Sequence, residues 1–154
     1  MFVWRICAAK YQESAFSGIG GLYVSGRWHP QGFKIVYTAE SLALASLEIF
    51  VHLESNDVSL IAIKAWLSDD LPIETVEPKQ LPKNWQDTLA YKKLQRIGAD
   101  WLTSRRTSIL QIPSSIVPVE YNYLLNPEHP DFKIDLEPPI EFEFDNRMWK
   151  PISS

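Results

Sequence analysis

The chain has 154 residues, a net charge of -4 and a pI of about 5.4, with 45% hydrophobic and 22% charged residues. This composition is typical of a globular protein and excludes disorder over the whole chain. Nucleic-acid-binding surfaces are usually basic because they displace counterions from phosphates, so the acidic balance argues against direct nucleic-acid binding.

Length and cysteine content narrow the class further. The length predicts a single domain spanning residues 1–154. The one cysteine, Cys7, excludes an internal disulfide, and the three scattered histidines add no metal-ligand spacing, so we expect no metal. The N-terminus has no signal-peptide pattern, and no apolar run approaches the ~20 residues of a membrane helix. We therefore expect a soluble, cytoplasmic protein without membrane contact.

The first part of the chain combines strand and helix signals with a glycine-rich loop. Residues 1–8 are apolar and predict a strand, and residues 10–33 hold five of the six glycines and predict a long loop. A second strand is predicted over 34–39. Ser41 is a candidate N-cap for a helix over 42–53.

The second part predicts more strands than helices. The predicted elements are a buried strand (58–67), a proline-marked loop (72–82), a helix (85–103), two short strands (107–112 and 116–121), a turn-rich segment (123–132) and a half-exposed strand (139–145). This order indicates an α+β fold with a largely antiparallel sheet and a few helices.

Glu48 is unusual because it lies within the predicted helix over 42–53, where most neighbouring positions are apolar. An unpaired carboxylate on such a face is costly. Two interpretations remain open: a structural carboxylate that pairs with His52 or reaches solvent, and a functional carboxylate on the wall of a cleft.

Arg27 and Tyr37 are candidate ligand-binding residues. Arg27 lies in a turn rich in glycine and proline, and its planar guanidinium suits phosphate or carboxylate; the alternative is a surface arginine stacked on Trp28. Tyr37 lies in the second predicted strand and could stack on a planar heterocycle, although core packing is the commoner role.

Ser114, Ser115 and Arg5 complete the candidates. The two serines lie between Pro113 and Pro118, where a hydroxyl could cap the loop backbone or contact a phosphate or ribose. Arg5 lies in the first predicted strand, with an internal ion pair as its structural alternative.

Four segments together resemble the RES domain family. They are "WR" at 4–5, "GGLYVSGRWHPQG" at 20–32, "IVYTAESLALASLE" at 35–48 and "IPSSIVPVEYNYLLNPEHPDF" at 112–132. The segments occur in the family's order and span most of the chain. Each one alone is a weak signal, whereas the combination is specific.

The resemblance implies a fold like that of ADP-ribosyltransferases and a toxin of a bacterial type II toxin–antitoxin pair that degrades NAD. It implies catalytic Glu48 and Arg27, and NAD-binding Arg27, Tyr37 and Ser114, with Ser115 as the alternative serine. It also implies an Xre-type antitoxin covering the active site, and a homodimer within that complex. The acceptor of ADP-ribose stays open between water, phosphate and protein.

Two further functions remain alternatives to NAD degradation. The first is an ADP-ribosyltransferase that modifies a cellular protein. The second is a non-catalytic module that uses its acidic surface to bind a basic partner.

Overall fold

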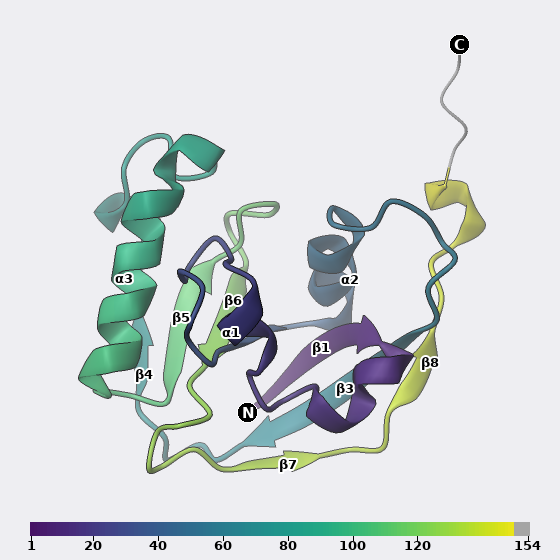
Figure 1. The fold of residues 1–154 in the computed structure, drawn as a ribbon, viewed down its shortest axis with the longest axis horizontal. Coiled ribbons are helices and arrows are strands. Elements are labelled where there is room, and N and C mark those ends of the chain that lie inside the picture. The colour runs from purple at the N-terminus through teal and green to yellow at the C-terminus, as the bar shows by residue number, and fades with distance from the viewer. Residues whose placement is uncertain (150–154) are drawn as a thin grey trace.

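The computed structural model describes residues 1–149, which form one eight-stranded sheet with helices packed against it (Figure 1). The strands are β1 (Phe2–Ala8), β2 (Val36–Ala39), β3 (Leu60–Leu67), β4 (Ile73–Thr75), β5 (Ile109–Pro113), β6 (Tyr121–Leu125), β7 (Ile134–Leu136) and β8 (Ile140–Phe142). The α-helices are α1 (Gly20–Tyr23), α2 (Leu42–Phe50) and α3 (Tyr91–Ser104). Short 3₁₀ helices cover Ala9–Ser14, Pro78–Gln80, Thr88–Ala90 and Asn146–Met148.

The sheet has the order β4-β5-β6-β2-β1-β3-β7, with β8 also paired to β3. All pairs are antiparallel except β4 with β5. β1 pairs with β3 along its whole length, but it meets β2 only at Trp4 and Ala39. The sheet therefore opens between β1 and β2.

α2 and α3 pack over different parts of the sheet (Figure 1). Leu44 and Ala45 of α2 bury against Ile6 and Ala39. Burying a leucine side chain fully stabilises a fold by roughly 1.5–3 kcal/mol, so these contacts fix the helix on the sheet.

α3 has an apolar face at helical spacing. Leu94 and Trp101 of this face are fully buried and pack with Leu110 and Leu124 of the sheet. Gly98 lies between them, and a Cβ there would stand 1.6 Å from the Trp28 carbonyl oxygen. Glycine therefore lets the Trp28 backbone lie directly against α3.

The α+β prediction is confirmed, with a largely antiparallel sheet. The predicted strands at 1–8, 34–39, 58–67 and 107–112 correspond to β1, β2, β3 and β5. Ser41 caps α2 as predicted, because its Oγ accepts from the Leu44 amide at 3.1 Å. α2 ends at Phe50, three residues before the predicted end.

The prediction was wrong over 116–125, whereas 126–132 is turn-rich as predicted. Residues 116–120 form turns, and β6 covers Tyr121–Leu125, which we predicted as mostly turn. Pro118 lacks the N–H that a central strand needs, so the apolar run before it cannot pair. The short strands β4 and β7 were also missed, and the strand predicted over 139–145 is limited to β8.

Within residues 1–149, every helix is too short or too polar to cross a membrane.

Candidate active site

A cavity of about 650 Å³ lies at the opening between β1 and β2, and residues of both strands line it. Its volume is in the range of small-molecule sites. Three predicted site residues, Arg27, Tyr37 and Glu48, line this one cavity together with Arg5 and Asn122. Ser115 also lines it, whereas Ser114 is fully buried behind the lining.

Glu48 is held by two hydrogen bonds to one of its carboxylate oxygens. Oε1 accepts from Ser114 Oγ at 2.7 Å and from Asn122 Nδ2 at 2.7 Å. Oε2 has no hydrogen-bond partner within residues 1–149. The expected alternative partner, His52, forms no ion pair with Glu48 in this part of the chain. The carboxylate is thus oriented from one side and leaves its second oxygen free.

Ser114 uses its hydroxyl completely. Oγ donates to Glu48 and accepts from the backbone N–H groups of Ile116 and Val117 at 3.1 and 3.0 Å. A hydroxyl has one donor and two acceptor positions, so no position is left for a ligand. This geometry differs from the expected contact with a phosphate and matches the loop-capping alternative, with Glu48 as an added partner.

Arg27 is held at the N-terminal end of α3 by groups distant in sequence. Its Nη1 donates to the carbonyl oxygens of Trp85 and Gln86, both at 3.1 Å. The guanidinium carbon lies 4.8 Å from the centre of the Tyr91 ring, a cation–π distance. The expected alternative of stacking on Trp28 is not observed, because Trp28 is buried in the core.

Tyr37 and His29 form a buried hydrogen-bond chain that fixes the Arg27 loop. His29 Nε2 lies 2.9 Å from the Val24 carbonyl, which can only accept, so the proton is on Nε2. Nδ1 then accepts from the Tyr37 hydroxyl at 2.7 Å, and that hydroxyl accepts from the Trp28 amide at 3.2 Å. Gly26 gives the hydroxyl room, since a Cβ there would lie 2.7 Å from it.

Burial shifts the proton affinities of this chain. It raises the pKa of Tyr37 well above its ordinary value, so the phenol stays protonated. It lowers the pKa of His29, and the hydrogen bond to the Val24 carbonyl opposes this shift only partly. Both side chains are therefore neutral at neutral pH.

Arg5 is a second cation in the cavity lining. Nη1 donates to the Tyr37 carbonyl at 3.0 Å, and the buried Nε has no partner. Burial lowers the pKa of Arg5, but arginine starts above ~12 and stays charged. The internal ion pair, which was the structural alternative for Arg5, does not form within residues 1–149.

Sequence reasoning missed several residues of the site. Asn122 was overlooked because it fell at the border of a predicted turn. Tyr91 was considered only as part of a predicted helix, and His29 was considered only as a possible metal ligand and rejected as one. The alternation of Asn122 with the aromatic residues Tyr121 and Tyr123 is the signal that could have shown a strand there.

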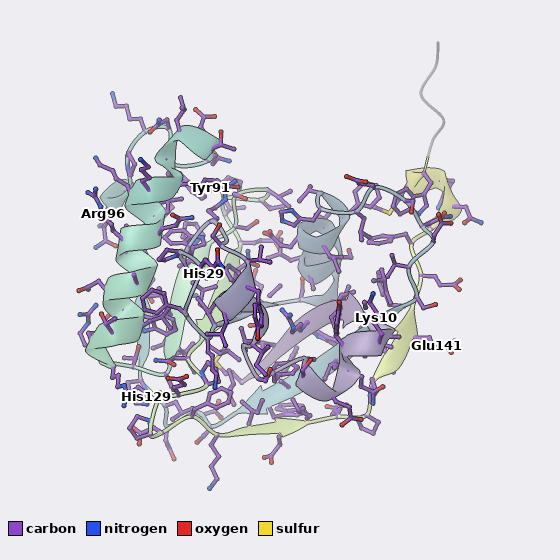
Figure 2. All side chains as sticks on the ribbon, in the orientation of Figure 1. Lys10, His29, Tyr91, Arg96, His129 and Glu141 are labelled. Carbon is purple, nitrogen blue, oxygen red and sulfur yellow. The ribbon has the colours of Figure 1, made fainter. Side chains whose placement is uncertain are left out.

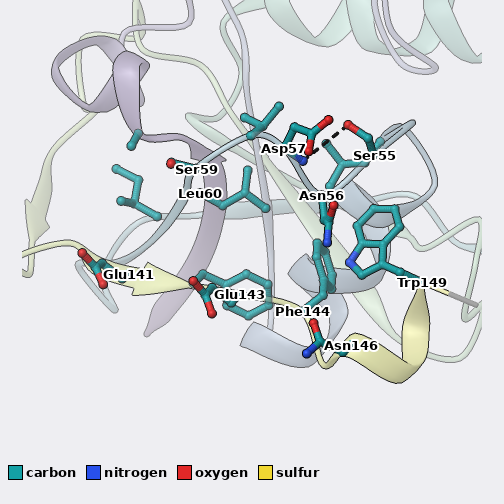
Figure 3. Close-up of a pocket in the computed structure, with 15 residues that line it drawn as sticks. Ser55, Asn56, Asp57, Ser59, Leu60, Glu141, Glu143, Phe144, Asn146 and Trp149 are labelled. Atoms are coloured by element: carbon teal, nitrogen blue, oxygen red, sulfur yellow. Dashed lines mark hydrogen bonds between the residues drawn. The ribbon is translucent and has the colours of Figure 1, made fainter.

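A second cavity, of about 470 Å³, lies between Ser55–Leu60 and the segment that follows β7 (Figure 3). Its charged lining residues, Asp57, Glu141 and Glu143, are all acidic. Such a lining repels phosphate. Trp149 packs here against Phe50 and Phe144.

Figure 2 places His29 and Tyr91 on the side of α3 that faces the sheet, and Arg96 on its outer side. Within residues 1–149, no three His, Cys, Asp or Glu side chains gather in a way that could hold a metal ion. The cavity lined by Arg5, Arg27 and Glu48 holds positive charges that suit a phosphate, whereas the second cavity is acidic. We therefore take the first cavity as the candidate active site.

Comparison with known proteins identifies the family of this chain. Residues 2–145 match the RES domain. The chain is 35% identical over 151 residues to Toxin Res of Yersinia enterocolitica, covering 96% of this chain and 99% of that protein. It is 40% identical over 136 residues to the Prs ADP-ribosylating toxin of a Sphingobium species, covering 84% of each. The chain therefore belongs to the RES domain family.

A solved structure confirms the fold. A chain of the MbcT–MbcA toxin–antitoxin complex of M. tuberculosis superposes with a TM-score of 0.76, over 92% of this chain and 83% of that chain. The sequence identity is 14%, so the likeness concerns the fold alone.

Proposed function

We propose that this protein is a toxin of a toxin–antitoxin pair that degrades NAD by cleaving the bond between nicotinamide and ribose. The observation that carries the proposal is the placement of Glu48 in one cavity with Arg27 and Arg5. Relatives of similar length are named as toxins, which supports the cellular role.

Glu48 is the catalytic residue of this proposal. As the glycosidic bond breaks, its electron pair moves to the ring nitrogen, and nicotinamide leaves neutral. The ribose carbon then develops positive charge, as in other glycosidic cleavages. The free Oε2 of Glu48 faces this charge from a position fixed before the reaction, which is how preorganised groups lower a barrier. Water or phosphate then attacks the ribose carbon and loses a proton.

Arg27 and Arg5 bind the diphosphate of NAD. Nη1 of Arg27 is occupied by two carbonyls, which leaves its other N–H groups for a ligand. Arg5 adds the unpaired Nε. Burial weakens screening by water, so two guanidiniums in a partly enclosed cavity attract a dianion strongly.

Tyr37 and Ser114 support these groups in different ways. The Tyr37 ring packs against nicotinamide or its ribose, while its hydroxyl stays bound to His29. Ser114 acts as a positioning residue for Glu48, since its hydroxyl is already fully used.

ADP-ribosyl transfer to a protein is the second candidate, favoured by the name of the Sphingobium relative. Both reactions pass through the same ribose cation and differ only in the acceptor. In transfer, a side chain of a target protein attacks in place of water or phosphate.

Mass spectrometry of the products of NAD tests the proposal. Purified protein, freed of any antitoxin, is incubated with NAD with and without phosphate. We expect nicotinamide together with ADP-ribose or, if phosphate attacks, its 1-phosphate. If the incubation is repeated in cell lysate with labelled NAD, a cellular protein that carries the label, with little free ADP-ribose, would favour transfer. If no nicotinamide forms in cell lysate either, the non-catalytic binding module is the better interpretation.

We propose an antitoxin of Xre type as the protein partner, seated over the cavity. The structural neighbour was solved as a toxin–antitoxin complex, which supports an antitoxin as the partner. A helix-turn-helix protein encoded beside this chain is expected to form a complex with it and to suppress nicotinamide release. Mass measurement of that complex would also show whether two copies of this chain occur in it.

A further inference from the structure

Asn122 has a hydrogen-bonding group that nothing in the described protein satisfies. The residue is 8% exposed, and its Nδ2 donates to Glu48 Oε1 at 2.7 Å. A carboxylate oxygen can only accept, so the amide nitrogen must face Glu48 and the orientation of the amide is settled. The carbonyl oxygen, Oδ1, is buried without a partner, and Asn122 lines the cavity.

Buried polar atoms without partners are rare in folded proteins, and each one calls for an explanation such as a missing partner or a catalytic role. Oδ1 can only accept, so the missing group is a hydrogen-bond donor. In the reacting half of NAD the donors are the ribose hydroxyls and the carboxamide N–H₂, because the diphosphate and the ring nitrogen have none.

We propose that Asn122 Oδ1 accepts a hydrogen bond from the 2-hydroxyl of the nicotinamide ribose and makes the site specific for ribose over 2-deoxyribose. This inference rests on the proposed function. Glu48 faces the reacting ribose carbon, and Asn122 is bonded directly to Glu48. The 2-hydroxyl is on the neighbouring carbon, so it is the donor closest to this pair of side chains.

The consequence is a specificity that one side chain controls. A site that hydrogen-bonds a substrate hydroxyl discriminates strongly against the analogue that lacks it, because its own polar group is then left unpaired. Asn122 would thus orient Glu48 through the hydrogen bond from Nδ2 and recognise the ribose hydroxyl through Oδ1.

The test compares kcat/KM for NAD with kcat/KM for its analogue deoxygenated at the 2-position of the nicotinamide ribose. The ratio of the two values is measured in wild type, Asn122→Ala and Ser114→Ala. The intrinsic reactivity of the analogue cancels when the ratios of two proteins are compared. Ser114→Ala is the matched control, since it also removes one donor to Glu48 Oε1 but keeps the Asn122 amide.

We expect the preference for NAD to fall about tenfold in Asn122→Ala, the effect of one hydrogen bond. Ser114→Ala should lose activity and keep the wild-type preference. If Asn122→Ala does not fold, Asn122→Ser replaces it, with the same fall expected because the serine hydroxyl is too short to reach the place of Oδ1.

Three results would overturn the inference. If wild type releases nicotinamide but the preference is unchanged in the Asn122 variant, the residue only orients Glu48 and the proposed function stands. If the lost preference instead concerns an analogue with an altered carboxamide, Oδ1 reads the nicotinamide. If wild type releases no nicotinamide, the proposed function fails and the inference fails with it.

Discussion

The cavity has two sides that are held in place by different kinds of contact. On the α2 side, Glu48 is fixed by two side chains: Asn122, which lies in β6, and Ser114, which directly follows β5. On the α3 side, Arg27 is fixed by backbone carbonyls and the Tyr91 ring. Hydrogen bonds from side chains hold one oxygen of Glu48, and hydrogen bonds to backbone carbonyls hold one nitrogen of Arg27.

This difference indicates a division of work. A fixed carboxylate suits the reacting carbon, where small displacements cost rate. Arg27 keeps several N–H groups beyond Nη1, which suits a diphosphate because a diphosphate can be bound in several geometries. The following substitutions test the two sides of the cavity separately. The largest effect on activity is expected from the α2 side.

Glu48→Gln removes the charge and keeps the shape. The glutamine oxygen can still accept from Ser114 and Asn122, so the fold should be retained. We expect kcat for nicotinamide release to fall about 100-fold to 1000-fold, as for loss of one preorganised group, with little change in KM. Glu141→Gln, in the second cavity, is the control and should keep the wild-type rate. Equal loss in both variants would contradict a specific role of Glu48.

Arg27→Ala should act mainly on binding. A hydrogen bond to a charged group contributes about 1.5–3 kcal/mol, which corresponds to a rise in KM of roughly 10-fold to 100-fold. Steady-state kinetics measure this. Arg96→Ala removes an arginine from the outer side of α3 and should leave KM unchanged (Figure 2). A fall in kcat without a rise in KM would assign Arg27 to the chemical step.

Gly98→Ala tests how the Arg27 loop is fixed to α3. The added Cβ would meet the Trp28 carbonyl at 1.6 Å, so helix and loop must separate. We expect a loss of about 1–3 kcal/mol in the free energy of unfolding, as for other overpacked sites, measured by urea denaturation. Lys93→Ala, at an exposed position of α3, is the control. An unchanged stability in Gly98→Ala would show that the contact is loose.

The smallest effect concerns pH. The pKa of His29 is lower in the folded protein than its unfolded value of ~6.5, so the unfolded state binds more protons below that pH. Stability should therefore fall as pH decreases below ~6.5. His29→Gln should weaken this dependence in thermal unfolding, and His52→Gln, at an exposed position, should not. The same dependence in all three proteins would exclude His29 as its source.

The sequence allowed the α2 side to be predicted better than the α3 side. Ser41, α2 and Glu48 are close in sequence, and local capping and periodicity are sufficient to place them. The partners of Arg27 come from residues 85–91, and only the packing of α3 brings them near. Asn122 was missed because the sequence predicted a strand over 116–121, around Pro118, and the strand is instead β6, which contains Asn122. A fully buried serine that orients a carboxylate also cannot be told from a phosphate-binding serine by local sequence.

A crystal structure of Glu48→Gln with NAD bound tests the central claim most directly. The account predicts the reacting ribose carbon beside the side chain at position 48 and the diphosphate against Arg27, both within the cavity between β1 and β2. NAD bound in the acidic second cavity, or with its diphosphate away from Arg27 and its ribose away from position 48, would contradict the account.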